Sequence, residues 1–206
     1  MIEVKLISIT ENAEEVIELA ARTCYSSRDR IYSSNRAIFL KRLKEMGHLS
    51  VFEHASATFD ISGISRACSH QLVRHRLASY SQRSQRYVSE EGFDYVIPPS
   101  IEGRPEAKKL FTQEMERLRE GYNRLVSLGI PKEDARFILP NACTTHLVMT
   151  ANFREWLHIL SLRLEKRAQW EIRTLMEKIL EILKEKAPAV FGDINPQSTK
   201  NEKSLS

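Results

Sequence analysis

The chain contains only seven glycines among its 206 residues, and none of them stands in a phosphate-binding motif. Neither the Gly-x-x-x-x-Gly-Lys pattern of a P-loop nor the Gly-x-Gly-x-x-Gly pattern of a dinucleotide-binding βαβ unit occurs. A glycine cradle that binds phosphate through the backbone is therefore not expected. A phosphate or nucleotide ligand would have to be bound by side chains.

Suitable side chains are concentrated in residues 74–87, which hold four arginines, one histidine, three serines and two tyrosines. No aspartate or glutamate occurs between Ile61 and Ser89, and the basic residues of that window include no lysine. Arginine binds phosphate or carboxylate through paired donors, whereas lysine acts as a point charge. The window therefore predicts a site for a polyanionic ligand.

The sequence beyond the arginines turns acidic at once, with Glu90, Glu91 and Asp94. An arginine-rich RNA-binding segment usually has lysine-rich flanks and a wider positive field. A confined pocket for a small nucleotide-type ligand is therefore favoured, and a non-catalytic RNA-binding module is the alternative. Tyr80 and Tyr87 could stack on a base or an isoalloxazine, or they could pack the loop as core residues.

The composition is typical of a soluble globular protein, with 42% apolar residues and a net charge of +4. Cys24, Cys68 and Cys143 show no Cys-x-x-Cys spacing, so neither structural disulfides nor a zinc site is expected. The first residues lack the apolar run of a signal peptide, and no segment reaches the roughly 18 apolar residues of a membrane span. We expect a cytoplasmic protein with no metal and no membrane contact.

The periodicity of the chain predicts one α+β domain at residues 1–191, with a mixed or antiparallel sheet flanked by long helices, and a polar tail at 192–206. Strands are predicted at 2–9, 57–62 and 144–150. Helices are predicted from Thr10 as a cap to Cys24, near 37–47, at 64–72, at 106–128, after Pro131, from Asn152 as a cap, and at 168–186, with a polar loop at 26–34.

Other reactive groups have ordinary structural interpretations. His48 and His54 are six residues apart, which is not a helical metal-ligand spacing, so a loop with hydrogen-bonded histidines is favoured over zinc. Cys143 could be a nucleophile, but a small buried residue beside a strand is the favoured interpretation. No Gly-x-Ser-x-Gly motif supports a serine hydrolase.

Four segments resemble, in order, those of the flavin-dependent thymidylate synthases. Residues 74–84 carry the Arg-His-Arg, seven residues, Ser signature, and residues 47–54 carry the Gly-His-x-Ser/Thr-x-Phe-Glu-His pattern. Residues 135–140 are similar to the Ala-Arg-x-x-Leu-Pro segment, and residues 152–172 are similar to the carboxy-terminal block with Asn-Phe-Arg, Leu-Arg and Ala-Gln-Trp-Glu-Ile. The chain is identified as a member of this family.

The resemblance implies the fold of that family and conversion of dUMP to dTMP. The methylene group would come from 5,10-methylenetetrahydrofolate and the hydride from FAD, which NAD(P)H recharges. The resemblance also implies no cysteine nucleophile, no nucleic-acid partner, and a homotetramer in which subunits share each active site. Shared sites would let a glycine-poor chain bind three large ligands. A family member that binds FAD but has lost methylation is a further alternative.

The resemblance implies roles for individual residues. Arg163 is the expected catalytic residue, because a fixed cation against the uracil ring stabilises charge that develops there. The FAD-binding residues are expected to be Ser50, Arg74, His75, Arg76, Gln82, Asn152, Phe153, Arg154 and His158. The dUMP-binding residues are expected to be Gln71, Leu72, Val73, Arg74, Gln82, Arg83, Ser84, Gln85, Arg86, Arg136 and Arg163. Ser84 is interpreted as a phosphate ligand, since no adjacent base would activate it as a nucleophile.

Two of these positions depart from some family members. Gln82 stands where some relatives have glutamate, so hydrogen bonding to flavin or dUMP is retained but a charge-dependent role is not expected. His158 stands where some have asparagine. A helix-face residue packed against the neighbouring strand is the favoured interpretation of His158, and a flavin contact is the alternative.

Overall fold

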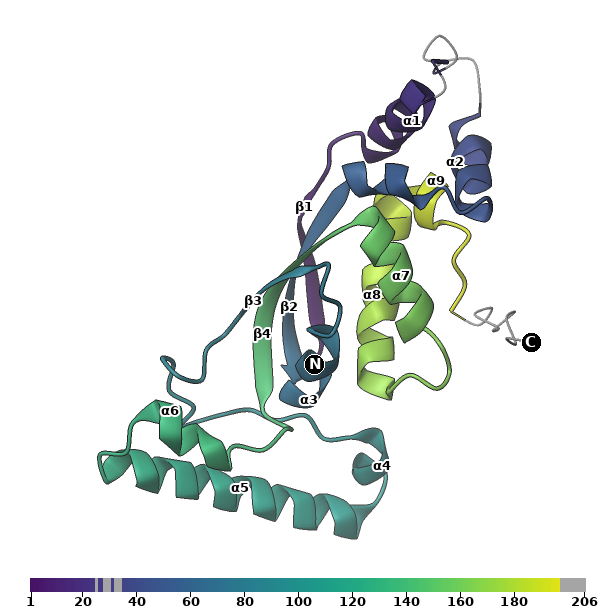
Figure 1. Ribbon diagram of the computed structural model, residues 1–206. Helices are drawn as coiled ribbons and strands as arrows, with labels where there is room; N and C mark the ends of the chain where they lie inside the picture. Colours follow the sequence, from purple (N-terminus) through teal and green to yellow (C-terminus); the bar gives the residue numbers. More distant parts are fainter. Residues whose placement is uncertain (25, 28–30, 32–34, 197–206) are drawn as a thin grey trace, which may run out of the picture. The chain divides into compact units, whose positions relative to one another are not determined.

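A computed structural model describes residues 1–24, 26–27, 31 and 35–196 (Figure 1). The strands are β1 (Glu3–Ile9), β2 (Ser56–Ser65), β3 (Ser79–Gln82) and β4 (Thr144–Asn152). The helices of the first half are α1 (Ala13–Cys24), α2 (Arg36–Glu45), the 3₁₀ helix η2 (Leu49–His54) and α3 (Arg66–Leu72). Those of the second half are α4 (Pro99–Glu102), α5 (Pro105–Ser127), α6 (Lys132–Ala135), the 3₁₀ helix η3 (Arg136–Ile138), α7 (Phe153–Arg163), α8 (Trp170–Lys186) and α9 (Pro188–Phe191).

The four strands form one sheet with the order β1-β2-β4-β3. Phe153, just after β4, donates its N–H to the carbonyl of Ala55, just before β2 (2.8 Å). At the other end of the pair, Arg66 N–H donates to Cys143 O (2.8 Å). The start of β2 therefore lies beside the end of β4, and these strands are antiparallel. The predicted α+β class with an antiparallel sheet is confirmed.

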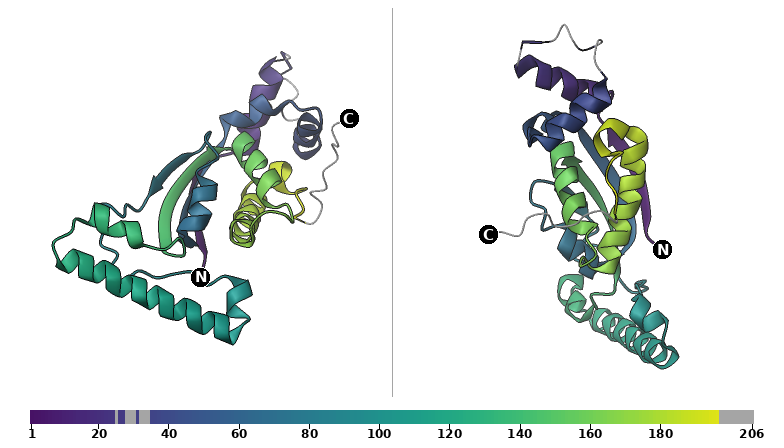
Figure 2. Two further views of the ribbon diagram at one scale, coloured as in Figure 1. Left: turned by 60° about the horizontal axis from the view of Figure 1, so that its bottom comes forward. Right: turned by 90° about the vertical axis from the view of Figure 1, so that its right-hand side faces the viewer.

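The chain divides into two compact units. Unit 1 comprises residues 1–3, 61–72 and 81–147, and unit 2 comprises residues 4–60, 73–80 and 148–206. In unit 2, the indole of Trp156 on α7 packs edge-on against Phe59 of β2, with ring centroids 5.2 Å apart, and its Nε1–H donates to Ala57 O (3.2 Å). Figures 1 and 2 show α8 running alongside α7. This packing fixes α7, which carries several of the predicted site residues.

Unit 1 contains the longest helix, α5, and the acidic segment that follows the arginine window packs on it. Tyr122 Oη of α5 accepts a hydrogen bond from Glu90 N–H (3.2 Å). Arg119 donates to Phe93 O (2.7 Å), and its guanidinium lies 5.2 Å from the centroid of the Phe93 ring. These contacts hold residues 90–93 against the helix and leave Glu90 and Phe93 buried.

Most of the predicted helices and strands are confirmed, with ends shifted by a few residues. Gly47, with φ of +75°, follows the end of α2 as expected. Ile64 belongs to β2 rather than to α3, and α3 ends at Leu72, so Arg74 follows the carboxyl end of this helix. The strand β3 was not predicted, because its sequence Ser-Tyr-Ser-Gln lacks an apolar alternation. The short helices α4 and α9 were also missed.

The two predicted helix caps have different outcomes. Thr10 does not cap α1, which begins at Ala13; instead, Thr10 Oγ1 accepts a hydrogen bond from Ser56 N–H (2.9 Å). Asn152 caps α7 as predicted, because its Oδ1 accepts a hydrogen bond from Glu155 N–H (2.8 Å). The predictions for residues 26–34 and 192–206 fall partly on residues outside those that the structure describes.

Gly63 in β2 is a position where a side chain is excluded. Its φ is +70°, and an added Cβ would lie 2.2 Å from Met1 O. We expect Gly63→Ala to lower the free energy of unfolding by about 1–3 kcal/mol, through left-handed backbone strain and displacement of the amino-terminal residue. Urea unfolding would measure this. Gly92→Ala is the matched control, because a Cβ there meets nothing within 4 Å, and an equal effect of both substitutions would contradict the account.

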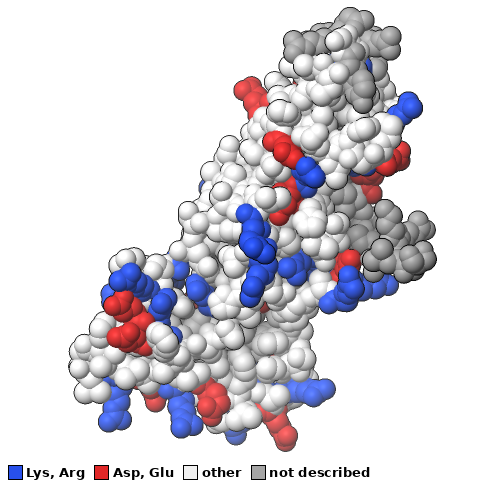
Figure 3. Space-filling view, viewed as in Figure 1, with Lys and Arg blue, Asp and Glu red and all other residues white. Residues whose placement is uncertain are grey.

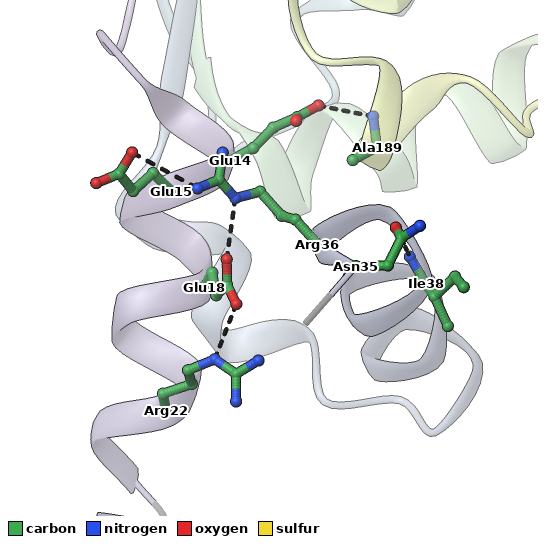
Figure 4. Close-up of polar contacts among 8 residues, drawn as sticks. All are labelled: Glu14, Glu15, Glu18, Arg22, Asn35, Arg36, Ile38 and Ala189. Carbon is green, nitrogen blue, oxygen red and sulfur yellow. Dashed lines mark hydrogen bonds and ion pairs between the residues drawn. The ribbon is translucent and has the colours of Figure 1, made fainter. Parts of the chain in front are cut away.

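In unit 2, α1 and α2 are joined by a buried ionic network (Figure 4). The carboxylate of Glu18, which is fully buried, accepts hydrogen bonds from Arg22 Nε (2.8 Å) and Arg36 Nε (2.9 Å). Arg36 also lies 3.6 Å from Glu15, and the Arg22 guanidinium lies 4.3 Å from the centroid of the Phe39 ring. Burial alone would raise the pKa of Glu18, but the two arginines hold it below its ordinary value.

Candidate active site

The centre of the site in unit 2 is a contact between two predicted residues, His75 and Arg163. Arg163 is the last residue of α7, and its Nε–H donates to His75 Nε2 (2.9 Å). The phenol of Tyr80, at the start of the next strand, donates to His75 O (3.1 Å) and fixes the backbone of this segment. The folded chain therefore brings the proposed catalytic arginine together with the histidine of the Arg-His-Arg motif.

His75 is held in its neutral form. Its side chain is buried, and burial, Arg163 and His158 together lower its pKa to about 4. A neutral imidazole has one N–H and one acceptor nitrogen. Because Nε2 accepts from Arg163, the proton of His75 is on Nδ1.

Glu155 completes this cluster, although the sequence analysis did not select it as a site residue. Its Oε1 lies 3.9 Å from His75 Nδ1, and the side chain is buried. Burial raises the pKa of Glu155, while His158 and Arg154 oppose this. Glu155 lies three residues before His158 and eight before Arg163, so the helical period placed all three on one broad face. That spacing was the signal that could have identified Glu155.

A cavity of about 560 Å³ adjoins the cluster in unit 2. Its walls combine apolar and polar side chains: Leu49, Leu77, Arg154, Glu155, Leu157, His158 and Ser161. Arg154 and His158 are two of the predicted FAD residues, and Ser50 follows Leu49 in η2. Arg154 also forms an ion pair with Glu53 (2.5 Å). The ring of His158 lies edge-on to His75, with centroids 6.2 Å apart.

The other predicted FAD residues of unit 2 differ in exposure. Arg74 and Arg76 are exposed, and Leu77 beside them is 78% exposed. Phe153 is fully buried in the core against Phe191, with ring centroids 5.0 Å apart. Phe153 is therefore a packing residue, and neither its side chain nor its backbone is exposed.

In unit 1, Gln82 is held by two hydroxyl groups. Its Nε2 donates to Ser69 Oγ (2.9 Å) and to Thr145 Oγ1 (3.1 Å), and both hydroxyl residues are buried. The direction of the amide is thus set by α3 and β4 rather than by a charge.

The predicted phosphate-binding residues lie in the same unit. Glu133 brings Arg86 and Arg136 together, because its carboxylate pairs with Arg86 and its backbone carbonyl accepts from Arg136 Nε (3.1 Å). Ser84 Oγ accepts a hydrogen bond from Arg86 N–H (3.2 Å). Arg83 lies 3.4 Å from the buried carboxylate of Glu90. A hydroxyl and several guanidinium groups thus lie on the loop after β3 and at the start of η3.

Arg66 is a further basic residue of this cluster that the sequence analysis did not select. Burial and the charge of Arg136 lower the pKa of Arg66, so these two cations interact. Their repulsion would be relieved by an anion bound between them. The sequence feature that could have identified Arg66 is its position between Ile61 and Ser89, where no aspartate or glutamate occurs. Among the remaining predicted dUMP residues, Leu72 is buried, Gln71 and Gln85 are half-buried, and Val73 is exposed.

Cys143 is unsuited to nucleophilic attack. It is fully buried, and burial together with Glu90 raises the pKa of its thiol to about 12. A thiol with so high a pKa is protonated at neutral pH and is a weak nucleophile. The interpretation of Cys143 as a small buried residue beside a strand is confirmed.

Comparison with known proteins identifies the family. A family model described as "Thymidylate synthase complementing protein" matches residues 5–189. The chain belongs to this family. A flavin-dependent thymidylate synthase of Geobacter sulfurreducens is 46% identical over 202 residues, covering 94% of this chain and 87% of the relative. Those of Clostridium tetani (38% identical; 95% and 87% covered) and Sulfurisphaera tokodaii (40%; 94% and 77%) are also similar.

Two further observations concern what this thymidylate synthase family member presents to its surroundings. Among the described residues, no group of three or more histidine, cysteine, aspartate or glutamate side chains is arranged to hold a metal ion. No helix within the described ranges has the length and apolar character needed to cross a membrane.

The neutral state of His75 predicts a pH dependence of stability. In the unfolded chain His75 takes up a proton below its ordinary pKa of 6.5, whereas in the folded protein it does so only near 4. The contribution of neutral His75 to the free energy of unfolding is therefore fully present above pH 6.5. It is lost as the pH falls toward 4, by up to about 3 kcal/mol. Between pH 7.5 and 5, we expect the wild type to lose about 2 kcal/mol more than His75→Gln in urea unfolding.

The control for this measurement is His54→Gln, because His54 is exposed. It should lose the same stability as the wild type over this pH range. If His75→Gln also follows the wild type, then His75 is not held neutral by the fold.

Proposed function

We propose that the chain is a flavin-dependent thymidylate synthase that converts dUMP to dTMP. dUMP, 5,10-methylenetetrahydrofolate and FADH2 give dTMP, tetrahydrofolate and FAD, and NAD(P)H then recharges the flavin. The observation that carries the proposal is the Arg163–His75 contact beside a cavity, in a chain that belongs to this family. The contact supports the proposal because it holds the guanidinium of Arg163 in a defined direction.

The residues of the cavity suit part of a flavin dinucleotide. Its volume of about 560 Å³ is within the ordinary range for ligand sites, and its leucines provide apolar walls. Arg154 and His158 supply polar groups, and a guanidinium is suited to a diphosphate. Ser50, Arg74, His75, Arg76, Gln82 and Asn152 are the remaining proposed FAD contacts. Bound reduced flavin would supply the hydride.

Arg163 would act on the pyrimidine of dUMP. A guanidinium remains charged at every accessible pH, and its contact with the neutral imidazole of His75 adds no opposing charge. Such a cation against the uracil ring stabilises negative charge on the pyrimidine, eases ionisation at N3 and activates the ring for attack. No cysteine nucleophile is required.

The dUMP phosphate would be bound by Ser84, Arg86 and Arg136. A dianion suits a hydroxyl and two guanidinium groups that are already oriented by Glu133. Gln71, Leu72, Val73, Arg74, Gln82, Arg83 and Gln85 are the other proposed dUMP contacts. We also propose a homotetramer with shared active sites, which rests on the resemblance. A single functional domain at residues 1–191 with a tail at 192–206 and a cytoplasmic location are proposed from the sequence pattern and the cysteine spacing.

An RNA-binding role is not supported. On the face that Figure 3 shows, blue and red side chains are interspersed over the helices of unit 1, in the lower part of the view. A backbone-binding surface for nucleic acid would need a more continuous positive field.

Steady-state formation of dTMP by purified, flavin-stripped protein tests the proposal. With dUMP, 5,10-methylenetetrahydrofolate and NADPH under anaerobic conditions, dTMP should form only after FAD is added. Formation of dTMP without FAD, or no dTMP despite bound FAD, would refute the proposed reaction.

A further inference from the structure

We propose that Glu155 is a positioning residue of the reaction, which fixes the tautomer of His75 and, through His75, the orientation of the Arg163 guanidinium. The inference depends on the proposed function for the role of Arg163. The contacts themselves are independent of it.

The hydrogen bond between Arg163 and His75 requires one particular tautomer of His75. Arginine can only donate, so His75 Nε2 must carry a lone pair in order to accept from Arg163 Nε–H at 2.9 Å. The opposite tautomer, and equally the imidazolium, would place an N–H group directly against the N–H of Arg163. The contact therefore exists only while the proton of His75 is on Nδ1.

Glu155 lies close to the proton on His75 Nδ1. Oε1 of Glu155 lies 3.9 Å from His75 Nδ1, which is longer than a hydrogen bond, so the carboxylate acts on the Nδ1–H group through its charge. His75 is 6% exposed and Glu155 is 4% exposed, so water screens their interaction poorly. A carboxylate oxygen favours an N–H on the nitrogen that faces it and disfavours a lone pair there. Glu155 thereby selects the tautomer that Arg163 requires.

Helix α7 holds both partners of His75. Glu155 lies in the first turn of α7, where Asn152 Oδ1 accepts its backbone N–H (2.8 Å), and Arg163 is the last residue of the same helix. The amino-terminal end of a helix also favours a carboxylate. Two side chains of α7 therefore lie against the two ring nitrogens of His75.

The contact with His75 restricts the orientation of the Arg163 guanidinium plane. The five N–H donors of a guanidinium lie in one plane, so fixing the direction of Nε–H restricts the directions of the terminal amino groups. A cation held in place stabilises developing charge better than one that must reorient, and a displacement of about 1 Å can cost on the order of 100-fold in rate. Glu155 would thus affect turnover by way of His75 without contacting the substrate.

Two substitutions separate this role from others. Glu155→Leu removes the acceptor at similar volume, and Glu155→Gln removes the charge but keeps an oxygen that can face Nδ1–H. Apolar replacement of a buried ion commonly leaves stability unchanged, and both variants retain the backbone hydrogen bond to Asn152. Glu155→Met is a second apolar variant, to be used if Glu155→Leu does not fold.

The readouts are the tautomer and the kinetics. In protein labelled with ¹⁵N-histidine, NMR reports which ring nitrogen is protonated, and His75→Gln assigns the His75 signals. Wild type and Glu155→Gln should show the Nδ1–H form with kcat values within about fivefold of each other. Glu155→Leu should populate the Nε2–H form and lower kcat by about 10–100-fold.

Each contrary outcome is distinct. If Glu155→Leu keeps the Nδ1–H form, or if Glu155→Gln loses as much activity as Glu155→Leu with its tautomer intact, the positioning role is wrong. If the wild type makes no dTMP at all, the proposed function fails, while the NMR comparison still decides whether Glu155 sets the tautomer of His75.

Discussion

Arg163→Ala is expected to lower the rate of dTMP formation by at least about 10²–10³-fold, the loss typical of removing one group that stabilises developing charge. The substitution removes both the cation and the Nε–H that contacts His75. Arg163 lies outside the residues that line the cavity, so FAD should bind to the variant with nearly unchanged affinity. Anaerobic dTMP assays and flavin titration by absorbance would measure the two effects.

Arg163→Lys is the matched control. A lysine keeps the positive charge but provides no planar set of donors, so its activity should lie between those of the wild type and Arg163→Ala. If Arg163→Ala retains more than about a tenth of wild-type turnover, Arg163 is not the group that activates the pyrimidine.

Glu18→Ala is expected to lower the free energy of unfolding by about 3–5 kcal/mol, because it leaves the buried Arg22 without its carboxylate. Loss of the Glu18 carboxylate should be less costly at Arg36 than at Arg22, since the Arg36 side chain is 34% exposed and also faces Glu15. Urea unfolding would measure the change. Removing both charges in Glu18→Leu/Arg22→Met should restore much of the lost stability, because apolar pairs of similar volume are tolerated in such places.

The exposed pair of Lys41 and Glu45 is the control for this prediction. Both side chains are more than half exposed, so Glu45→Ala should change stability by less than about 1 kcal/mol. An effect of Glu18→Ala no larger than that of Glu45→Ala would show that the network in Figure 4 does not stabilise the fold.

Much of the fold followed from local pattern. Alternation predicted β1 and β2, β-branched residues predicted β4, the helical period predicted α5 and α8, and Asn152 was recognised as the cap of α7. β3 could not be predicted, because its polar residues are placed by pairing with β4 rather than by burial. Thr10 was assigned to the helix because a local rule cannot foresee its hydrogen bond to Ser56, 46 residues away.

For the site, motif resemblance supplied the candidate residues but not their mutual contacts. Arg163 and His75 are 88 residues apart, and their hydrogen bond depends on how α7 packs. Glu155 was hidden because an acidic residue three positions after a cap has an ordinary helical explanation. Its burial beside His75 appears only in the folded chain. The assignments of the FAD and dUMP contacts remain predictions.

The most direct test of the central claim is a single turnover. Protein loaded with reduced FAD, without pyridine nucleotide or oxygen, would be mixed with dUMP and 5,10-methylenetetrahydrofolate, and dTMP and flavin absorbance would be followed together. The account predicts one dTMP for each flavin that becomes oxidised, at the same rate. Flavin that stays reduced while dTMP forms, or flavin that is oxidised without dTMP, would contradict it.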